Sequence, residues 1–124
     1  MKNILIVDND LGFVFWLGEV LAGANYQPWP ACSVSEALPI MDRKLLIPLD
    51  LLIVNPSLPG ASHLIAHSRR SQAELKVIAL GSNNERVTPA VDAWRRKPNP
   101  ADLSAGQKWV RAIDRMFSGH KRAA

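Results

Sequence analysis

The sequence predicts an α/β fold in which a doubly wound parallel sheet of five strands carries helices on both faces. Two observations support this class. Short apolar runs rich in branched side chains alternate along the chain with longer stretches of helical period, which is the element order of a parallel sheet. The run at 51–54, Leu-Leu-Ile-Val, has no polar position, as expected for a strand that helices cover on both sides.

Strands are expected where the apolar runs are short. Pro28 and Pro30 fall in the second of these runs. Because proline has no N–H to donate to a neighbouring strand, this strand should lie at an edge of the sheet. The predicted strands cover residues 4–7, 27–31, 51–54, 75–80 and 93–96.

Helices are expected in the periodic stretches between the strands. Asp10 is a suitable N-cap for the first helix, and Ser-Val-Ser-Glu at 33–36 has the pattern of a capping box for the second. Pro39 should kink that second helix or end it early. Residues 83–93 are too few for a full helix and its turns before the last strand, so the fourth helix should be short or absent. The other predicted helices cover residues 11–24, 33–43, 61–70 and 100–118.

The bulk composition limits the kind of protein. A chain of 124 residues with 48% hydrophobic content is long enough for one core and too short for two ordinary domains. We expect a single domain over residues 1–124, and the N-terminal part of a longer protein would show the same pattern. After Met-Lys-Asn, only four apolar residues precede Asp8, so we expect a cytoplasmic location without membrane contact. The single cysteine, Cys32, excludes an internal disulfide and is expected to pack as a small apolar residue.

The charge balance is basic. The chain has 15 Lys and Arg against 11 Asp and Glu, a net charge of +4. Clustered cations supply the sequence-independent part of nucleic-acid binding, so a nucleic-acid contact is one alternative and a solvated basic face is the favoured one. Most of the excess lies late in the chain, at Arg69, Arg70, Arg95, Arg96, Lys97, Lys108, Arg111, Arg115, Lys121 and Arg122.

Four residues fall at or just after the ends of predicted strands. They are Asp8, Asn55, Gly81 and Lys97. Ligand chemistry in parallel sheets gathers at the carboxyl ends of the strands. Four separated segments should therefore converge on one pocket.

The segments that supply this pocket resemble the receiver domain of bacterial response regulators. The resemblance rests on Ile-Leu-Ile-Val-Asp-Asn-Asp at 4–10, on Leu-Leu-Ile-Val-Asn-Pro-Ser at 51–57 and on Lys97-Pro98. It covers nearly the whole chain, with the middle helices matching least. The resemblance implies a CheY-like, flavodoxin-like fold and a place in two-component signal transduction or a phosphorelay. In that family, an acid pair after the first strand holds a divalent cation and an aspartate after the third accepts a phosphoryl group. A Ser or Thr follows the fourth strand, and a Lys-Pro follows the fifth.

The chain departs from the family pattern at the residues that carry this chemistry. Asn55 occupies the position of the family's phosphoacceptor aspartate, and an amide is not a nucleophile for phosphorus. Asn9 stands at the second acid, and a neutral amide oxygen is a weaker ligand for a hard cation than a carboxylate. Asp10 is either a substitute ligand or, the favoured interpretation, the helix cap. We therefore expect no cofactor, no metal site, and weak or absent Mg²⁺ binding.

Three further positions matter for a receiver-like switch. The family's hydroxyl position falls on Gly81, and Ser82 would fill it only if the strand register slipped by one residue. The resemblance implies a cis peptide bond between Lys97 and Pro98 that aims Lys97 at the acceptor position. Trp94 falls where receivers often carry a switch aromatic, and an ordinary core or edge aromatic is an equal alternative.

Two other groups of side chains are candidate chemical sites. Ser57 is a conceivable phosphoacceptor in the turn after the third strand, but no neighbouring residue resembles the base that a serine nucleophile needs. His63 and His67 are spaced i, i+4 and should share a helix face. Two ligands without a third make a poor zinc site.

The sequence as a whole predicts a degenerate or pseudo-receiver that is not an enzyme. It should act by phosphorylation-independent protein–protein interaction with a signalling kinase, an effector domain or a second copy of itself. We expect Lys97 to be held by Asp8 and by the side-chain oxygen of Asn55, in place of the metal and the phosphate.

Two alternative functions stay open. One is nucleic-acid binding through Arg95, Arg96 and the cations of the last helix. The other is a residual phosphotransfer or small-ligand site that uses Asp8, Asp10 and Ser57.

Overall fold

The computed structural model describes residues 1–42, 48–72, 74–81 and 91–118 of the chain. The strands form one parallel sheet in the order β2-β1-β3-β4-β5, which confirms the predicted class. The strands are β1 (Asn3–Val7), β2 (Gln27–Ala31), β3 (Leu51–Val54), β4 (Lys76–Leu80) and β5 (Ala93–Arg95).

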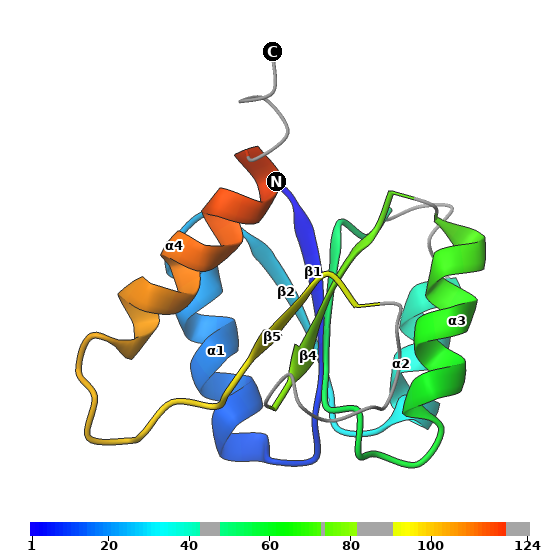
Figure 1. Cartoon of the computed structure of the whole chain (residues 1–124), viewed down its shortest axis with the longest axis horizontal. Coiled ribbons are helices and arrows are strands. Elements are labelled where there is room, and N and C mark those ends of the chain that lie inside the picture. The colour runs from blue at the N-terminus through cyan, green and yellow to red at the C-terminus, as the bar shows by residue number, and fades with distance from the viewer. Residues whose placement is uncertain (43–47, 73, 82–90, 119–124) are drawn as a thin grey trace.

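Helices cover both faces of the sheet, as Figure 1 shows: α1 and α4 lie on one side and α2 and α3 on the other. The predicted short or absent helix before β5 falls on residues 82–90, outside the described residues. No helix in the described ranges has the length and apolar character needed to cross a membrane. The helices are α1 (Leu11–Gly23), α2 (Val34–Asp42), α3 (Ala61–Ser71) and α4 (Ala105–Ser118).

The central strands separate two hydrophobic cores. In β1 and β3, every residue from Ile4 to Val7 and from Leu51 to Val54 is fully buried. Because side chains alternate along a strand, Ile4 and Ile6 pack with α1 and α4, and Leu5 and Val7 pack with α2 and α3. Burial on both faces fixes the register, and this fixes the positions of the residues that follow each strand.

The edge position predicted for β2 is confirmed. The Gln27 N–H donates to the carbonyl of Lys2, and the carbonyl of Ala31 accepts from Asp8 N–H at the other end of the strand. Donors alternate in direction along a strand, so Pro28 and Pro30 occupy the positions that face away from β1. The missing N–H groups therefore cost no ladder bond and leave a poor template for another strand.

Side chains cap the first two helices as expected. Asp10 Oδ1 accepts from Phe13 N–H at 3.2 Å, and Ser33 Oγ accepts from Glu36 N–H at 3.2 Å. The carboxylate of Glu36 turns one residue further back and accepts from the N–H and the thiol of Cys32. Pro39 lies inside α2 without ending it.

Cys32 differs from its prediction as a packed apolar residue. It is partly exposed, and its thiol donates to Oε2 of Glu36 at 3.1 Å. This hydrogen bond raises the pKa of the Cys32 thiol above its ordinary value.

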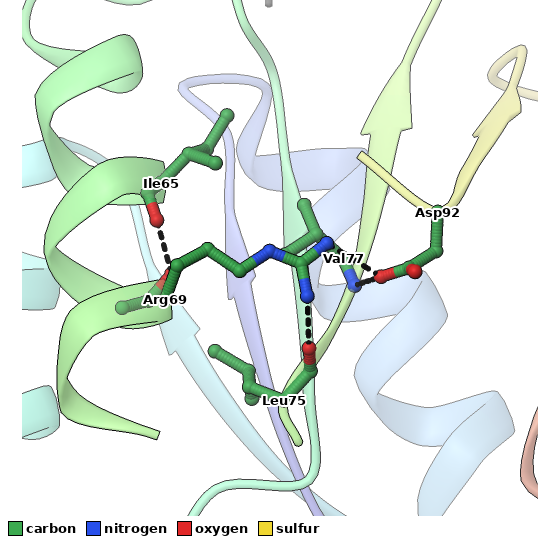
Figure 2. Close-up of polar contacts among 6 residues, drawn as sticks. Ile65, Arg69, Leu75, Val77 and Asp92 are labelled. Atoms are coloured by element: carbon green, nitrogen blue, oxygen red, sulfur yellow. Dashed lines mark hydrogen bonds and ion pairs between the residues drawn. The ribbon is translucent and has the colours of Figure 1, made fainter. Parts of the chain in front are cut away.

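An arginine brace ties α3 to the last two strands (Figure 2). Arg69 on α3 donates through Nη1 to the carbonyl of Leu75 at 2.6 Å and through Nη2 to Oδ2 of Asp92 at 2.8 Å. The same Asp92 oxygen accepts the N–H of Val77 at 2.7 Å. Because Asp92 immediately precedes β5, the brace sets where this short edge strand begins against β4.

The last helix starts later than predicted, at Ala105 instead of residue 100. Asn99 Oδ1 accepts from Ala101 N–H, and Asp102 Oδ1 accepts from both the N–H and the hydroxyl of Ser104. Such side-chain bonds to nearby backbone compete with helix formation. Residues 96–104 therefore form a connection that contains two turns, and Leu103 in it is 98% exposed.

Candidate functional site

The predicted site forms at the carboxyl ends of β1, β3 and β5. Asp8 directly follows β1 and Asn55 directly follows β3, and these strands pair Val7 with Val54. The N–H of Asn55 donates to the carbonyl of Val7 at 3.0 Å, so the backbone holds the two polar residues side by side. Lys97 follows β5 by two residues and reaches the same place from the far edge of the sheet.

Asp8 is the centre of the site. Its side chain is fully buried, and Oδ2 lies 2.6 Å from Nζ of Lys97. This contact is an ion pair, and Oδ2 has no hydrogen-bond partner among the described residues. Oδ1 accepts from Nδ2 of Asn55 at 2.9 Å. Both carboxylate oxygens are therefore engaged, and a buried carboxylate of this kind depends on its cation.

Asn55 does not hold Lys97 by its oxygen, so that prediction is wrong. Oδ1 of Asn55 accepts the N–H of Ser57 at 2.9 Å and closes the turn after β3. The orientation of the amide follows from its neighbours. If the amide were rotated by half a turn, its NH₂ group would face another donor, the N–H of Ser57, and its oxygen would face another acceptor, the carboxylate of Asp8. Only the observed orientation satisfies both contacts.

Asp10 has two contacts. One oxygen caps α1, as predicted, and Oδ2 lies 3.7 Å from Nζ of Lys97. Its side chain is 51% exposed, compared with 34% for Lys97. Lys97 also lies over the ring of Phe13, with 5.5 Å from Nζ to the centroid. Phe13 was missed as a site residue, and its spacing of three from Asp10 on α1 was the available signal.

Gly81 directly follows β4 in a conformation that disfavours the family's hydroxyl residue. Its φ is +137°, a region that side-chain-bearing residues rarely adopt, and its N–H donates to the carbonyl of Arg95 at 2.9 Å. Ser82, the other predicted hydroxyl, lies outside the described residues. Asn9 and Ser57 are exposed.

The predicted cis bond before Pro98 is wrong. The described residues contain no cis peptide bond, so Lys97 reaches Asp8 through a trans bond. Trans is the lower-energy isomer before proline, and the long lysine side chain spans the remaining distance. Trp94, the predicted switch aromatic, is half-buried on β5 beside Ala79 of β4.

His63 and His67 lie on one face of α3, as predicted. Their rings stack with centroids 6.4 Å apart, and Nε2 of His67 lies 3.4 Å from Oδ1 of Asp42 on α2. Within the described ranges, no group of three or more His, Cys, Asp or Glu side chains is arranged to hold a metal ion.

Comparisons of sequence find no match for the chain, and comparisons of structure identify its fold. No protein-family model and no curated protein matches the sequence. A response regulator receiver domain protein (CheY-like) from Methanospirillum hungatei matches with a TM-score of 0.79 at 19% identity, over 100% of this chain and 99% of that chain. The signal receiver domain of an HD domain-containing protein from Pseudomonas fluorescens matches with a TM-score of 0.75 at 19% identity, over 98% and 92%.

A third similar solved structure is a complex with Mg(2+)-BeF. Response regulator protein TrrA from Thermotoga maritima, in complex with Mg(2+)-BeF, matches with a TM-score of 0.67 at 26% identity, over 89% of this chain and 99% of that chain. Together with the strand order, these similarities show that the chain has the CheY-like fold of response regulator receiver domains.

Proposed function

We propose that this chain is a receiver domain of two-component signalling that works through protein contacts and not through phosphorylation of an aspartate. The observation that carries the proposal is the hydrogen bond from Nδ2 of Asn55 to Oδ1 of Asp8. An aspartate has no hydrogen to donate there at neutral pH. The family's acceptor residue therefore cannot make this hydrogen bond, and the Asn55 amide can.

The acceptor position offers no nucleophile. Both polar groups of the Asn55 amide are engaged, the nitrogen by Asp8 and the oxygen by Ser57 N–H. Phosphoryl transfer to a receiver requires a carboxylate oxygen that attacks phosphorus in line. Without that carboxylate, Lys97 neutralises Asp8 instead of a phosphoryl group.

The residues present do not fit the divalent cation that this fold family implies. Mg²⁺ favours carboxylate oxygens in near-octahedral geometry. The Asp8 carboxylate is engaged by Lys97 and Asn55, and the two other expected oxygen donors are the amides Asn9 and Asn55. We propose that Mg²⁺ binding is weak or absent, and no step of the function runs through a metal.

The surface near the site supports a protein partner, whether a signalling kinase, an effector domain or a second copy. Leu11 and Phe15, one turn apart on α1, are 50% and 58% exposed, and Leu103 in the connection to α4 is 98% exposed. Neighbouring exposed apolar side chains, as Leu11 and Phe15 are on one face of α1, are the kind of feature that contact surfaces contain.

The contacts of the basic residues favour a protein partner over nucleic acid. The guanidinium of Arg95 lies over the ring of Trp109 at 5.2 Å, and Lys108 pairs with Asp102 at 3.0 Å. Both cations are therefore engaged in contacts within the chain that hold α4 and the connection before it. Retention on DNA or RNA at low salt, lost as salt rises, would favour the alternative.

The proposal is tested by incubating the intact chain with acetyl phosphate and Mg²⁺ and measuring its mass. We expect no added phosphoryl group, while a receiver with an acceptor aspartate, treated in parallel, gains one. Stoichiometric phosphorylation of the chain on any residue would overturn the proposal. Peptide mapping would then separate Ser57 from other acceptors.

A further inference from the structure

A cavity opens beside the Asp8–Lys97 pair. It lies between the first turns of α1 and the connection that links β5 to α4, which bows outward past the start of α1 in Figure 1. Its volume is about 390 Å³, within the range of small-molecule sites. The late start of α4 contributes to the cavity, because Pro100 and Asp102, which fall in the predicted helix, lie before α4 and form part of the wall.

The walls are largely aromatic and apolar. Phe13 and Trp16 line one side, with ring centroids 6.1 Å apart and planes tilted by 35°. Pro98 and Pro100 line the other side. Aromatic faces carry negative electrostatic potential and attract cations that are shielded from water.

The polar groups of the cavity favour a positive ligand. Oδ2 of Asp10 lies 3.7 Å from Lys97, too far for a hydrogen bond, and the side chain is half-exposed. Asp102 is a second carboxylate of the lining, and the hydrogen bond from Ser104 lowers its pKa to about 2. Lys108 pairs with Asp102 at 3.0 Å, so Asp10 is the carboxylate that is left for a ligand. Lys97 is the cation of the lining, and it lies 2.6 Å from Asp8, which neutralises it.

We propose that this cavity binds a small aromatic organic cation, with its ammonium or amidinium group on Asp10 and its ring against Phe13 and Trp16. The inference rests on the proposed function, because it supplies a regulator for a receiver that phosphate does not switch. A cation on Asp10 competes with Lys97 for that carboxylate. Ligand binding is thereby coupled to the Asp8–Lys97–Asn55 network.

The test uses benzamidine, a flat aromatic amidinium, and two probes of nearly the same shape, neutral benzamide and anionic benzoate. Each is titrated into the folded chain while backbone amide shifts are followed by NMR. We expect saturable binding of benzamidine in the millimolar range or tighter, with shifts at residues 10–16 and 97–102. Benzamide should bind at least about tenfold more weakly, which corresponds to roughly 1.4 kcal/mol.

Two variants assign the binding to Asp10. Asp10→Asn keeps a good helix cap and should weaken benzamidine binding several-fold without changing benzamide binding. Glu19→Gln, on α1 outside this cavity, is the matched control and should leave both unchanged. The ligand proposal is overturned if benzamidine does not bind at tens of millimolar, or if benzamide binds as tightly or benzoate more tightly. It is also overturned if Asp10→Asn binds benzamidine as tightly as the unchanged chain does. The phosphodonor experiment is independent, so a chain that neither binds benzamidine nor gains phosphate keeps the proposed function and loses only its regulator.

Discussion

Nδ2 of Asn55 donates to Oδ1 of Asp8 across 2.9 Å, at the point where β1 and β3 end side by side. The other oxygen of this buried carboxylate faces Lys97 at 2.6 Å. One anion, one cation and one amide thus form a neutral cluster that needs neither a metal nor a phosphoryl group to balance its charge. The cluster connects both central strands to the segment after β5.

Asn55→Asp should destabilise the fold at neutral pH and should not create a working switch. The substitution removes the donor to Asp8 and places a second carboxylate against that buried one, so we expect a loss of about 1–3 kcal/mol in unfolding free energy. Protonation of either carboxylate relieves the repulsion. The loss should therefore shrink as the pH of the urea titration is lowered from about 7 to about 4.

Asn99→Asp is the matched control for this substitution. Asn99 is exposed, and its Oδ1 accepts from Ala101 N–H, a contact that an aspartate also makes. Its stability should change little. Robust labelling of Asn55→Asp by acetyl phosphate and Mg²⁺ would show that Asn9 and Gly81 impair the switch less than we infer.

Lys97→Met should destabilise the fold strongly, because it leaves Asp8 buried without its cation. Removing one partner of a buried pair costs about 3–5 kcal/mol. Since Lys97 is 34% exposed, we expect about 2–3 kcal/mol in urea unfolding after discounting for solvent screening. Lys108→Met, which breaks a pair with the partly exposed Asp102, should have little effect. Equal losses of unfolding free energy for the two substitutions would mean that the buried Asp8–Lys97 pair contributes no more stability than the exposed Asp102–Lys108 pair.

Much of the fold could be predicted because the residues that decide it act locally or by simple burial. The all-apolar runs of β1 and β3, the prolines of β2 and the cap by Asp10 depend on period, missing donors and short-range bonds. The start of α4 was misplaced because Asp102 and Ser104 bond to each other and to nearby backbone, which periodicity does not report.

The membership of the site could be predicted better than its bonding. Strand ends bring Asp8, Asn55 and Lys97 together whatever their contacts are. Which atom of Asn55 faces Asp8 depends on Ser57 N–H, a backbone donor that appears only when the turn after β3 is folded. The isomer of the Lys97–Pro98 bond depends likewise on the path of the connection, and the family pattern was a poor guide to it.

Gly81→Ser should fail to restore the missing hydroxyl of the switch. A φ of +137° is strained for any residue with a Cβ, so we expect a loss of about 1–3 kcal/mol in urea unfolding. Gly23→Ser is the control, since Gly23 is the last residue of α1 and an added Cβ there meets no atom within 4 Å. A Gly81→Ser variant as stable as Gly23→Ser would show that β4 ends in a more tolerant conformation than the one described.

Asp92→Ala should loosen β5 and, through it, Lys97. The substitution leaves Val77 N–H without its 2.7 Å acceptor and removes one partner of Arg69. A buried donor left unsatisfied costs about 1–3 kcal/mol, and the partial exposure of Asp92 places the expected loss at the lower end. Hydrogen exchange should accelerate at Gly81, whose N–H donates to Arg95 of β5. Asp42→Ala, at a carboxylate that is 61% exposed, should leave exchange at Gly81 unchanged. Protection at Gly81 that survives Asp92→Ala would mean that the pairing of β4 with β5 holds that edge without the brace.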